Sequence, residues 1–182
     1  MKLYNHVILS LLLSILSVGY VQANEINAYK VRQGDMLDVS VWGDATLVKI
    51  TRVLPDGSIS FPLAGNLQVA GLSSTEIEQR ISTKLKKYLP DPEVTVIIQS
   101  TDGNKVYILG KVNTPGAILL QGPMTILQAL SISGGFDRFA NLDEIKIIRE
   151  KKVLDVHYSD LIRGKNLESN YILQADDTIL VP

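Results

Sequence analysis

Short runs of alternating apolar and polar residues dominate this chain, and they predict a protein built mainly of short strands. The apolar side chains recur at every second position, or in brief unbroken runs, at residues 37–41, 94–98, 106–109, 117–120, 144–148, 153–156 and 177–181. A period of two places successive side chains on opposite faces of a sheet. A further short strand is expected at 29–31. Two longer stretches have the spacing of a helix, so the sequence predicts an α+β fold.

A hairpin is predicted around Asp56-Gly57. These residues lie between Val53-Leu54 and the alternating pair Ile59 and Phe61. Asp-Gly in this setting is typical of a type I′ turn, because both residues tolerate the positive φ that the turn requires. Gly57 is therefore expected at positive φ, at the tip of a tight turn.

The first predicted helix begins with a complete capping signal. Ser73 is placed to cap it, and Glu76 follows at the spacing of a capping box. The apolar positions recur at spacing four and form one stripe, made of Ile77, Ile81 and Leu85. Pro90 and Pro92 end the helix. A helix with one apolar face is expected to lie on a sheet.

A second helix is predicted from the same kind of signal. Thr125 is placed to cap it, Gln128 follows three residues later, and Gly134-Gly135 ends it. Its expected apolar face consists of Ile126, Leu127, Leu130 and Ile132.

The polar segment Ser100–Asn104 divides the chain into two small modules, 24–100 and 104–182. Each contains a hairpin with glycine at its turn, a short strand, a capped helix and another strand. Residues 34–41 and 175–182 also share a pattern, an acidic turn followed by a short apolar strand. Duplication and the small vocabulary of β-rich modules explain this similarity equally well.

Residues 1–23 have the pattern of a secretory signal peptide. Lys2 supplies the positive start, Val7–Val18 the apolar run, and Val21-Gln22-Ala23 the small-residue cleavage site. An apolar run of about 12 residues is shorter than the roughly 20 that span a bilayer. We therefore expect cleavage after Ala23 and a mature chain outside the cytoplasm, rather than a membrane anchor.

Charge and cysteine content exclude several classes of protein. The chain has 18 Lys and Arg against 19 Asp and Glu, a formal net charge of −1. No basic field for nucleic acid is therefore expected. The sequence has no cysteine, which excludes disulfides, cysteine metal sites and an acyl anchor on an N-terminal cysteine.

Two acidic pairs are the nearest approach to a catalytic site. Asp35 and Asp38 are three positions apart, and Asp176 and Asp177 are adjacent. Glycoside hydrolysis needs two carboxylates about 5–10 Å apart. Each pair, however, stands at a turn beside a short strand, where aspartates commonly accept backbone hydrogen bonds, and the turn interpretation is favoured. His157 has no partners at metal-ligand spacing. No catalytic, metal or cofactor site is predicted.

Contact with sugar or with a partner is the remaining chemistry. The candidates are aromatic side chains that could stack on sugar rings and the polar side chains near them: Trp42, Tyr107, Phe136, Arg138, Phe139 and Asn141. Segment 136–141 follows the double glycine, where an exposed loop is expected. The alternative is that these aromatics cap the core of their module.

Blocks in both modules resemble the polysaccharide biosynthesis/export proteins of Gram-negative envelopes. The first module carries the blocks 29–43 with Gly34-Asp35, 55–73 with Pro55-Asp56-Gly57, and 89–96 with Asp91-Pro92. In the second module, Val106–Gly110, Pro115-Gly116, Gly134-Gly135 and 177–182 resemble the family's soluble-ligand-binding β-grasp (SLBB) module. The blocks occur in the family's order and cover nearly the whole mature chain.

The resemblance implies a non-enzymatic periplasmic component of a capsule or exopolysaccharide export machine. It implies a homo-oligomeric collar for the polysaccharide, docked to an inner-membrane copolymerase and to a separate outer-membrane channel. The family's lipoprotein cysteine is absent, and no amphipathic pore helix follows Pro182. The expected protein is therefore of the short class, not a lipoprotein, and peripherally associated with the outer membrane.

Two other functions stay open on the sequence. One is a monomeric periplasmic carbohydrate-binding module, and the other is a hydrolase that trims the polymer. For the export component, the Phe136–Asn141 loop is the expected docking surface, because it offers two aromatics and an arginine, which are favoured at interfaces.

Overall fold

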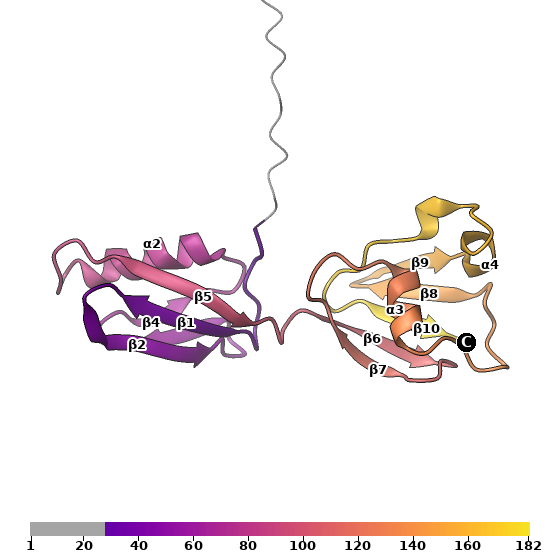
Figure 1. Ribbon diagram of the computed structural model, residues 1–182, viewed down its shortest axis with the longest axis horizontal. Coiled ribbons are helices and arrows are strands. Elements are labelled where there is room, and N and C mark those ends of the chain that lie inside the picture. The colour runs from indigo at the N-terminus through magenta and orange to yellow at the C-terminus, as the bar shows by residue number, and fades with distance from the viewer. Residues whose placement is uncertain (1–27) are drawn as a thin grey trace, which may run out of the picture.

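The computed structural model describes residues 28–182, which form two modules joined by a short linker (Figure 1). The predicted signal peptide, residues 1–23, lies outside the described residues. The fold is α+β, as predicted from the sequence, and each module has its own hydrophobic core.

The first module is a three-stranded sheet with a helix on one face and a small two-stranded sheet beside it. The elements are β1 (Met36–Val41), β2 (Asp44–Arg52), β3 (Ser58–Phe61), β4 (Gly65–Gln68), α2 (Ser74–Leu85) and β5 (Val94–Ser100). The larger sheet has the order β2-β1-β5, and β1 is antiparallel to both neighbours. Helix α2 lies behind β5 in Figure 1. It buries the predicted stripe of Ile77, Ile81 and Leu85.

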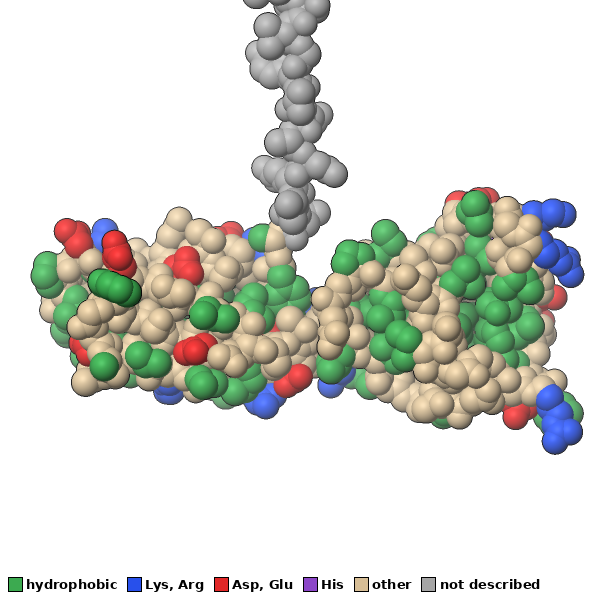
Figure 2. All heavy atoms as spheres, viewed as in Figure 1, with side chains coloured by type: hydrophobic (Ala, Val, Ile, Leu, Met, Phe, Trp, Pro, Cys, Tyr) green, Lys and Arg blue, Asp and Glu red, His purple; other side chains and the backbone are tan. Residues whose placement is uncertain are grey.

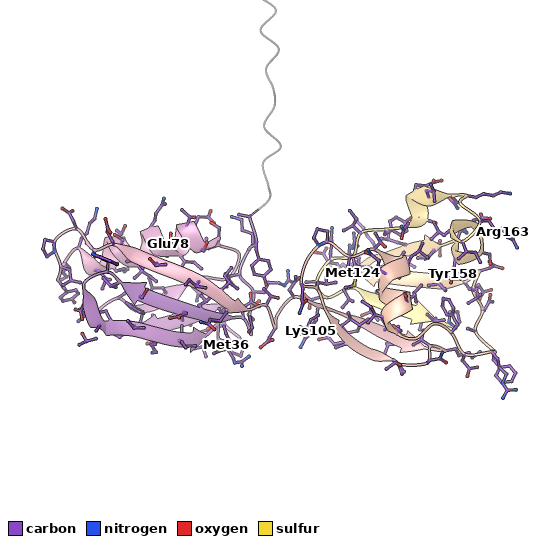
Figure 3. All side chains as sticks on the ribbon, viewed as in Figure 1. Met36, Glu78, Lys105, Met124, Tyr158 and Arg163 are labelled. Carbon is purple, nitrogen blue, oxygen red and sulfur yellow. The ribbon has the colours of Figure 1, made fainter. Side chains whose placement is uncertain are left out.

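The N-terminus of α2 has both halves of the capping box. Ser73 Oγ accepts a hydrogen bond from the Glu76 amide at 3.3 Å, and Glu76 Oε2 accepts one from the Ser73 amide at 2.6 Å. Further along the helix, Glu78 accepts a hydrogen bond from the Val96 amide at 2.9 Å (Figure 3). The helix is therefore fastened to the edge strand β5 by a polar contact as well as by its apolar stripe.

The turn at Asp56-Gly57 is of another type than predicted. The Gly57 amide donates to the Leu54 carbonyl at 2.8 Å, and the Leu54 amide donates to the Ser58 carbonyl at 2.9 Å. Gly57 has a φ of 81°, as predicted, but Asp56 does not have the positive φ that a type I′ turn needs. Pro55 is the reason: its fixed φ suits the first central position of an ordinary turn, which moves Gly57 one place beyond the centre.

Two further expectations about the first module are wrong. Strand β3 pairs with β4, whereas β2 pairs with β1, so the turn at Gly57 does not connect two paired strands. Residues 29–31 are not a strand. Val31 is nevertheless fixed and buried, because it exchanges backbone hydrogen bonds with Gly71 and Leu72.

The second module is a five-stranded sheet in the order β7-β6-β10-β8-β9. Its elements are β6 (Lys105–Gly110), β7 (Gly116–Leu119), α3 (Ile126–Ile132), β8 (Ile145–Arg149), β9 (Lys152–Val156), α4 (Tyr158–Leu161), η1 (Leu167–Ser169) and β10 (Thr178–Val181). The central strand β10 is parallel to β6 and antiparallel to β8. Helix α3 lies in front of the sheet in Figure 1.

Helix α3 has the predicted ends but a narrower buried face. Thr125 and Gln128 form its capping box, and Gly134 and Gly135 follow it with positive φ. Ile126, Ala129 and Leu130 are buried against the sheet. Ile132 was expected in that apolar face but is exposed. With about 3.6 residues per turn, its side chain is rotated away from the face formed by Ile126, Ala129 and Leu130.

Candidate functional site

The junction between the modules is where side chains of both halves converge. The linker residue Gly103 donates its amide to Asp35 Oδ1 at 2.9 Å. The next residue, Asn104, donates from its side chain to the Leu120 carbonyl and accepts from the Leu120 amide at 2.7 Å. Strand β6 starts directly after it at Lys105 (Figure 3). The linker is therefore hydrogen-bonded to the first module at one residue and to the second at the next.

Asp35 is the anchor on the first-module side. Its carboxylate is fully buried and accepts hydrogen bonds from the Tyr29 hydroxyl at 2.7 Å, the Arg32 amide at 2.8 Å and the Gly103 amide. The pKa of the Tyr29 hydroxyl is raised well above its usual range. Burial is the largest cause, and the hydrogen bond to Asp35 is the second. Both carboxylate oxygens have donors, so Asp35 acts here as a structural turn residue, the interpretation that the sequence favoured. Asp38, expected at the same turn, lies within strand β1 instead.

Asp177 is the corresponding buried carboxylate of the second module. Arg149 donates to it from two nitrogens, at 2.8 and 2.7 Å, and the Gln174 amide donates at 2.8 Å. This bidentate hydrogen bonding to Asp177 raises the pKa of the Arg149 guanidinium. Arg149 also donates to the Ile172 carbonyl at 2.9 Å, and so holds the segment before β10 against β8.

A cleft of about 620 Å³ lies between the modules at these two turns. Tyr29, Lys30 and Arg32 line it from the first module; Asn104, Arg149, Gln174 and Asp176 are among the residues that line it from the linker and the second. A second groove, of about 510 Å³, shares Tyr29 and Asn104 and is bordered by Ile98, Leu120 and Ile172.

The cations of the cleft are paired with carboxylates. Arg32 forms an ion pair with Asp176 of the second module. Lys30 forms an ion pair with Glu76 at 2.7 Å. This pair, together with the hydrogen bonds from Ser73, lowers the pKa of Glu76 to about 2. The cleft therefore presents hydrogen-bond donors and acceptors side by side without a field of one sign. Such a surface can bind hydroxyl groups, and it is not built to concentrate anions.

The six predicted contact residues do not form one site. Trp42 is 84% exposed at the turn between β1 and β2, at the end of the first module that lies away from the linker (Figure 1). Tyr107 lies on β6 in the second module and is partly exposed.

The other four follow α3. Phe136 packs edge-on against Tyr158 of α4, with ring centroids 4.7 Å apart (Figure 3). Phe136 is half-buried against the core of the second module, which agrees with the alternative that this aromatic covers the core and does not bind sugar. Phe139 is 69% exposed, and the Arg138 guanidinium lies 5.2 Å from its ring centre. Asn141 donates its amide to the Pro182 carbonyl at 2.7 Å.

The junction was not among the sequence candidates. Its signal was present in the similar phrases at 34–41 and 175–182, since both begin with the turns that hold Asp35 and Asp177. The contacts of Asp35 with Gly103 and of Arg32 with Asp176 join positions far apart in the chain, and no local pattern indicates them.

Within 28–182, the His, Asp and Glu side chains form no cluster that could hold a metal ion. No helix in the same range combines the length and the apolar character needed to cross a membrane.

Comparison with known families matches both modules. Residues 23–99 match the family described as polysaccharide biosynthesis/export protein, and residues 104–181 match the SLBB domain.

Individual relatives carry related names. The chain is 28% identical over 178 residues to the EPS I polysaccharide export outer membrane protein EpsA of Ralstonia nicotianae, covering 84% of this chain and 47% of the relative. It is 32% identical over 160 residues to the polysialic acid transport protein KpsD of Escherichia coli, covering 85% and 28%. It is 23% identical over 180 residues to the capsule polysaccharide export outer membrane protein CtrA of Neisseria meningitidis, covering 88% and 44%.

The chain thus spans less than half the length of each of these relatives. The two family matches follow one another in the order of the two modules, and together they cover almost all of the described residues. This chain belongs to the family of polysaccharide biosynthesis/export proteins.

Proposed function

We propose that this protein is a periplasmic component of a machine that exports capsule polysaccharide or exopolysaccharide. In this proposal it forms an oligomeric collar around the path of the polymer. The collar links an inner-membrane copolymerase to a separate outer-membrane channel, and the protein associates peripherally with that membrane without a lipid anchor of its own.

The observation that carries the proposal is the fixed junction between an export module and an SLBB module. The bond from Gly103 to Asp35 and the ion pair of Arg32 with Asp176 tie the two modules together. A collar that spans a gap between two membranes needs subunits whose halves keep their relative orientation, and these contacts favour one orientation.

A non-enzymatic role agrees with the state of one aspartate in each acidic pair, Asp35 and Asp177. Both oxygens of Asp35 and both of Asp177 accept hydrogen bonds from structural donors. A carboxylate committed in this way is not available as an acid, base or nucleophile for glycoside hydrolysis. The family matched by the first module is one of export proteins.

We assign partner docking to Arg138 and Phe139. The two side chains stack on each other in an exposed loop, and Lys111 donates to the Phe139 carbonyl at 3.1 Å, which steadies the loop. A rigid, exposed aromatic beside an arginine is typical of residues that dominate binding energy at interfaces.

The test of the function is a deletion strain in which polysaccharide is measured separately at the cell surface and in the periplasm. We expect loss of surface polymer and its accumulation in the periplasm, with both restored by the intact gene. Unchanged surface polymer would refute an essential role in export. Incubation of the purified protein with the polymer, followed by a reducing-end assay, tests the hydrolase alternative, and we expect no new reducing ends.

Docking is tested by co-purification of the outer-membrane channel with a variant carrying Arg138→Ala and Phe139→Ala. We expect the channel to be lost while the melting temperature stays nearly the same. Trp42→Ala is the matched control, because Trp42 is an equally prominent exposed aromatic on the other module. Retention of the channel by the double variant would refute this docking surface. Reconstitution of the protein alone in liposomes should give no conductance.

A further inference from the structure

One face of the second module carries no charge. Residues 112–136 contain no Lys, Arg, His, Asp or Glu, in a chain in which 20% of residues are charged. This segment forms β7, the connection to α3, and α3 itself. Figure 2 shows this face of the second module as hydrophobic and uncharged polar atoms, with charged side chains gathered at its margin. Depletion of charge is a mark of interface cores.

The same face is grooved and apolar. A groove of about 610 Å³ lies between β7 and α3, and its lining includes Ile118, Leu119, Pro123, Met124 and Ile132. Met124 is labelled on this side in Figure 3. Ile132 is 58% exposed on this side. Leu119 lines the groove from the edge strand β7, but its register with Lys105 turns its side chain to the other face of the sheet. We call Ile118 together with residues 123–132 the α3 face.

The opposite face of the module is an uncovered sheet. The residues that alternate with the core point away from α3, and the register places Tyr107, Thr178, Ile148 and Val153 in one row across four strands. Leu109 and Leu180 are paired in the next row. The large apolar side chains of this sheet face, Tyr107, Leu109, Ile148, Val153 and Leu180, are 36–58% exposed. Exposed apolar surface gathered in this way marks an interaction site.

We propose that the α3 face of one copy packs against the sheet face of the second module in the next copy. The proposal rests on the collar proposed above and assigns its contact surfaces. Both surfaces are apolar and belong to one module, but they lie on opposite sides of its sheet, so they cannot meet within one chain. Because the two surfaces differ, the contact is head-to-tail and repeats from copy to copy, and it forms a ring when the rotation between copies closes.

Charge favours a second copy over a strongly charged partner. The α3 face offers no group that could neutralise a buried charge, and an unpaired charge in an interface is costly. On the sheet face, Lys146 and Asp155 are direct register partners on β8 and β9. Their opposite charges lie side by side, so the sheet face brings no single-sign field against the uncharged α3 face.

The test uses one charged substitution on each surface, in the mature chain from residue 24. Ile132→Glu alters the α3 face and Leu109→Glu the sheet face; each should reduce the wild-type oligomer to monomer in sedimentation velocity runs across a dilution series. Ile162→Glu and Leu167→Glu are matched controls, since both residues are 61% exposed and lie outside the two surfaces. The controls should keep the wild-type size, and melting curves should show that all four variants are folded.

A mixture of Ile132→Glu and Leu109→Glu proteins separates this contact from a symmetric one. Each variant retains one intact surface, so an equal mixture should form dimers and nothing larger. A wild-type protein that stays monomeric, full-size oligomers in either variant, or monomers only in the mixture would each overturn the proposal. If the variants lose assembly but still restore surface polymer to the deletion strain, the contact stands and the collar function fails.

Discussion

Asp35 and Asp177 occupy the same position in two copies of one turn. Asp35 accepts from the amide of Arg32 and donates its own amide to the Arg32 carbonyl, at 2.8 and 3.2 Å. Asp177 makes the same pair of bonds with Gln174, at 2.8 and 3.1 Å. Both carboxylates are fully buried. Asp35 directly precedes β1, the central strand of the first module's larger sheet, and Asp177 directly precedes β10, the central strand of the second module's sheet.

The second bonding partner of each turn differs. The Asp35 carboxylate also accepts a hydrogen bond from the linker amide of Gly103, whereas the Asp177 carboxylate accepts its further hydrogen bonds from Arg149. The same local structure therefore closes one module onto the linker and the other onto its own strand β8.

Replacing Asp177 by alanine should destabilise the second module by about 3 kcal/mol, because Arg149 and the Gln174 amide lose their partner in a largely buried place. Urea denaturation measures the difference. Asp176→Ala is the matched control: that side chain is exposed and its ion pair with Arg32 is worth less than about 1 kcal/mol. Equal midpoints for the two variants would contradict a structural role for the Asp177–Arg149 pair.

The linker glycine should not tolerate a methyl group. A Cβ at Gly103 would overlap the Gln33 carbonyl oxygen and lie 2.9 Å from the Arg32 Cβ. Gly103→Ala should therefore cost about 1–3 kcal/mol. Calorimetry should show the loss, while Gly122→Ala, with no atom near its Cβ, should leave the melting temperature unchanged or slightly higher. The linker packing described here is incorrect if both variants melt alike.

Gly57 and Gly43 separate backbone strain from crowding. Their φ values are 81° and 80°, so alanine at either position suffers similar strain, about 1 kcal/mol or more. Only at Gly57 does the new Cβ meet a neighbour, Ala70 Cβ at 2.9 Å. Gly57→Ala should thus lower the denaturation midpoint further than Gly43→Ala. The reverse order would show that the turn at Gly57 is less tightly packed than described.

Glu76 should make stability depend on acid pH. Its pKa is lowered from 4.5 to about 2, first by the bond from Lys30 and then by the Ser73 bonds of the capping box. A carboxyl whose folded-state pKa is depressed stabilises the fold above its unfolded pKa, and this contribution is lost as pH falls through the folded value. The stability difference between wild type and Glu76→Gln should therefore shrink from pH 4.5 down to about pH 2. A constant difference across that range would rule out the ionised capping box.

Local features of the fold were predictable because their contacts are local. Ser73 with Glu76 and Thr125 with Gln128 each bond over three positions, and the sequence displays both partners together. The turn at Asp56-Gly57 was placed correctly but given the wrong type, because the Asp-Gly signal was read without the constraint that Pro55 imposes on its own φ.

Long-range features were not predictable from the same patterns. The strand at 177–181 was expected, but its insertion between β6 and β8 depends on pairing across most of the module. The junction likewise depends on contacts separated by 68 and 144 positions, those of Asp35 with Gly103 and of Arg32 with Asp176. Residue type alone did not predict which aromatic side chains lie close together: Trp42 is in the first module and Phe136 in the second.

The position of β10 has a consequence for folding during synthesis. The first module completes all of its strand pairings by Ser100, so it can fold as soon as that stretch has emerged. The second module cannot, because its central strand, 178–181, is the last one to be made. Until then, the β6–β7 and β8–β9 hairpins lack the strand that joins them, and Ile108 and Ile147 have no closed core to enter. That interval is when the new chain has open strand edges, and therefore when folding helpers and proteases compete for it.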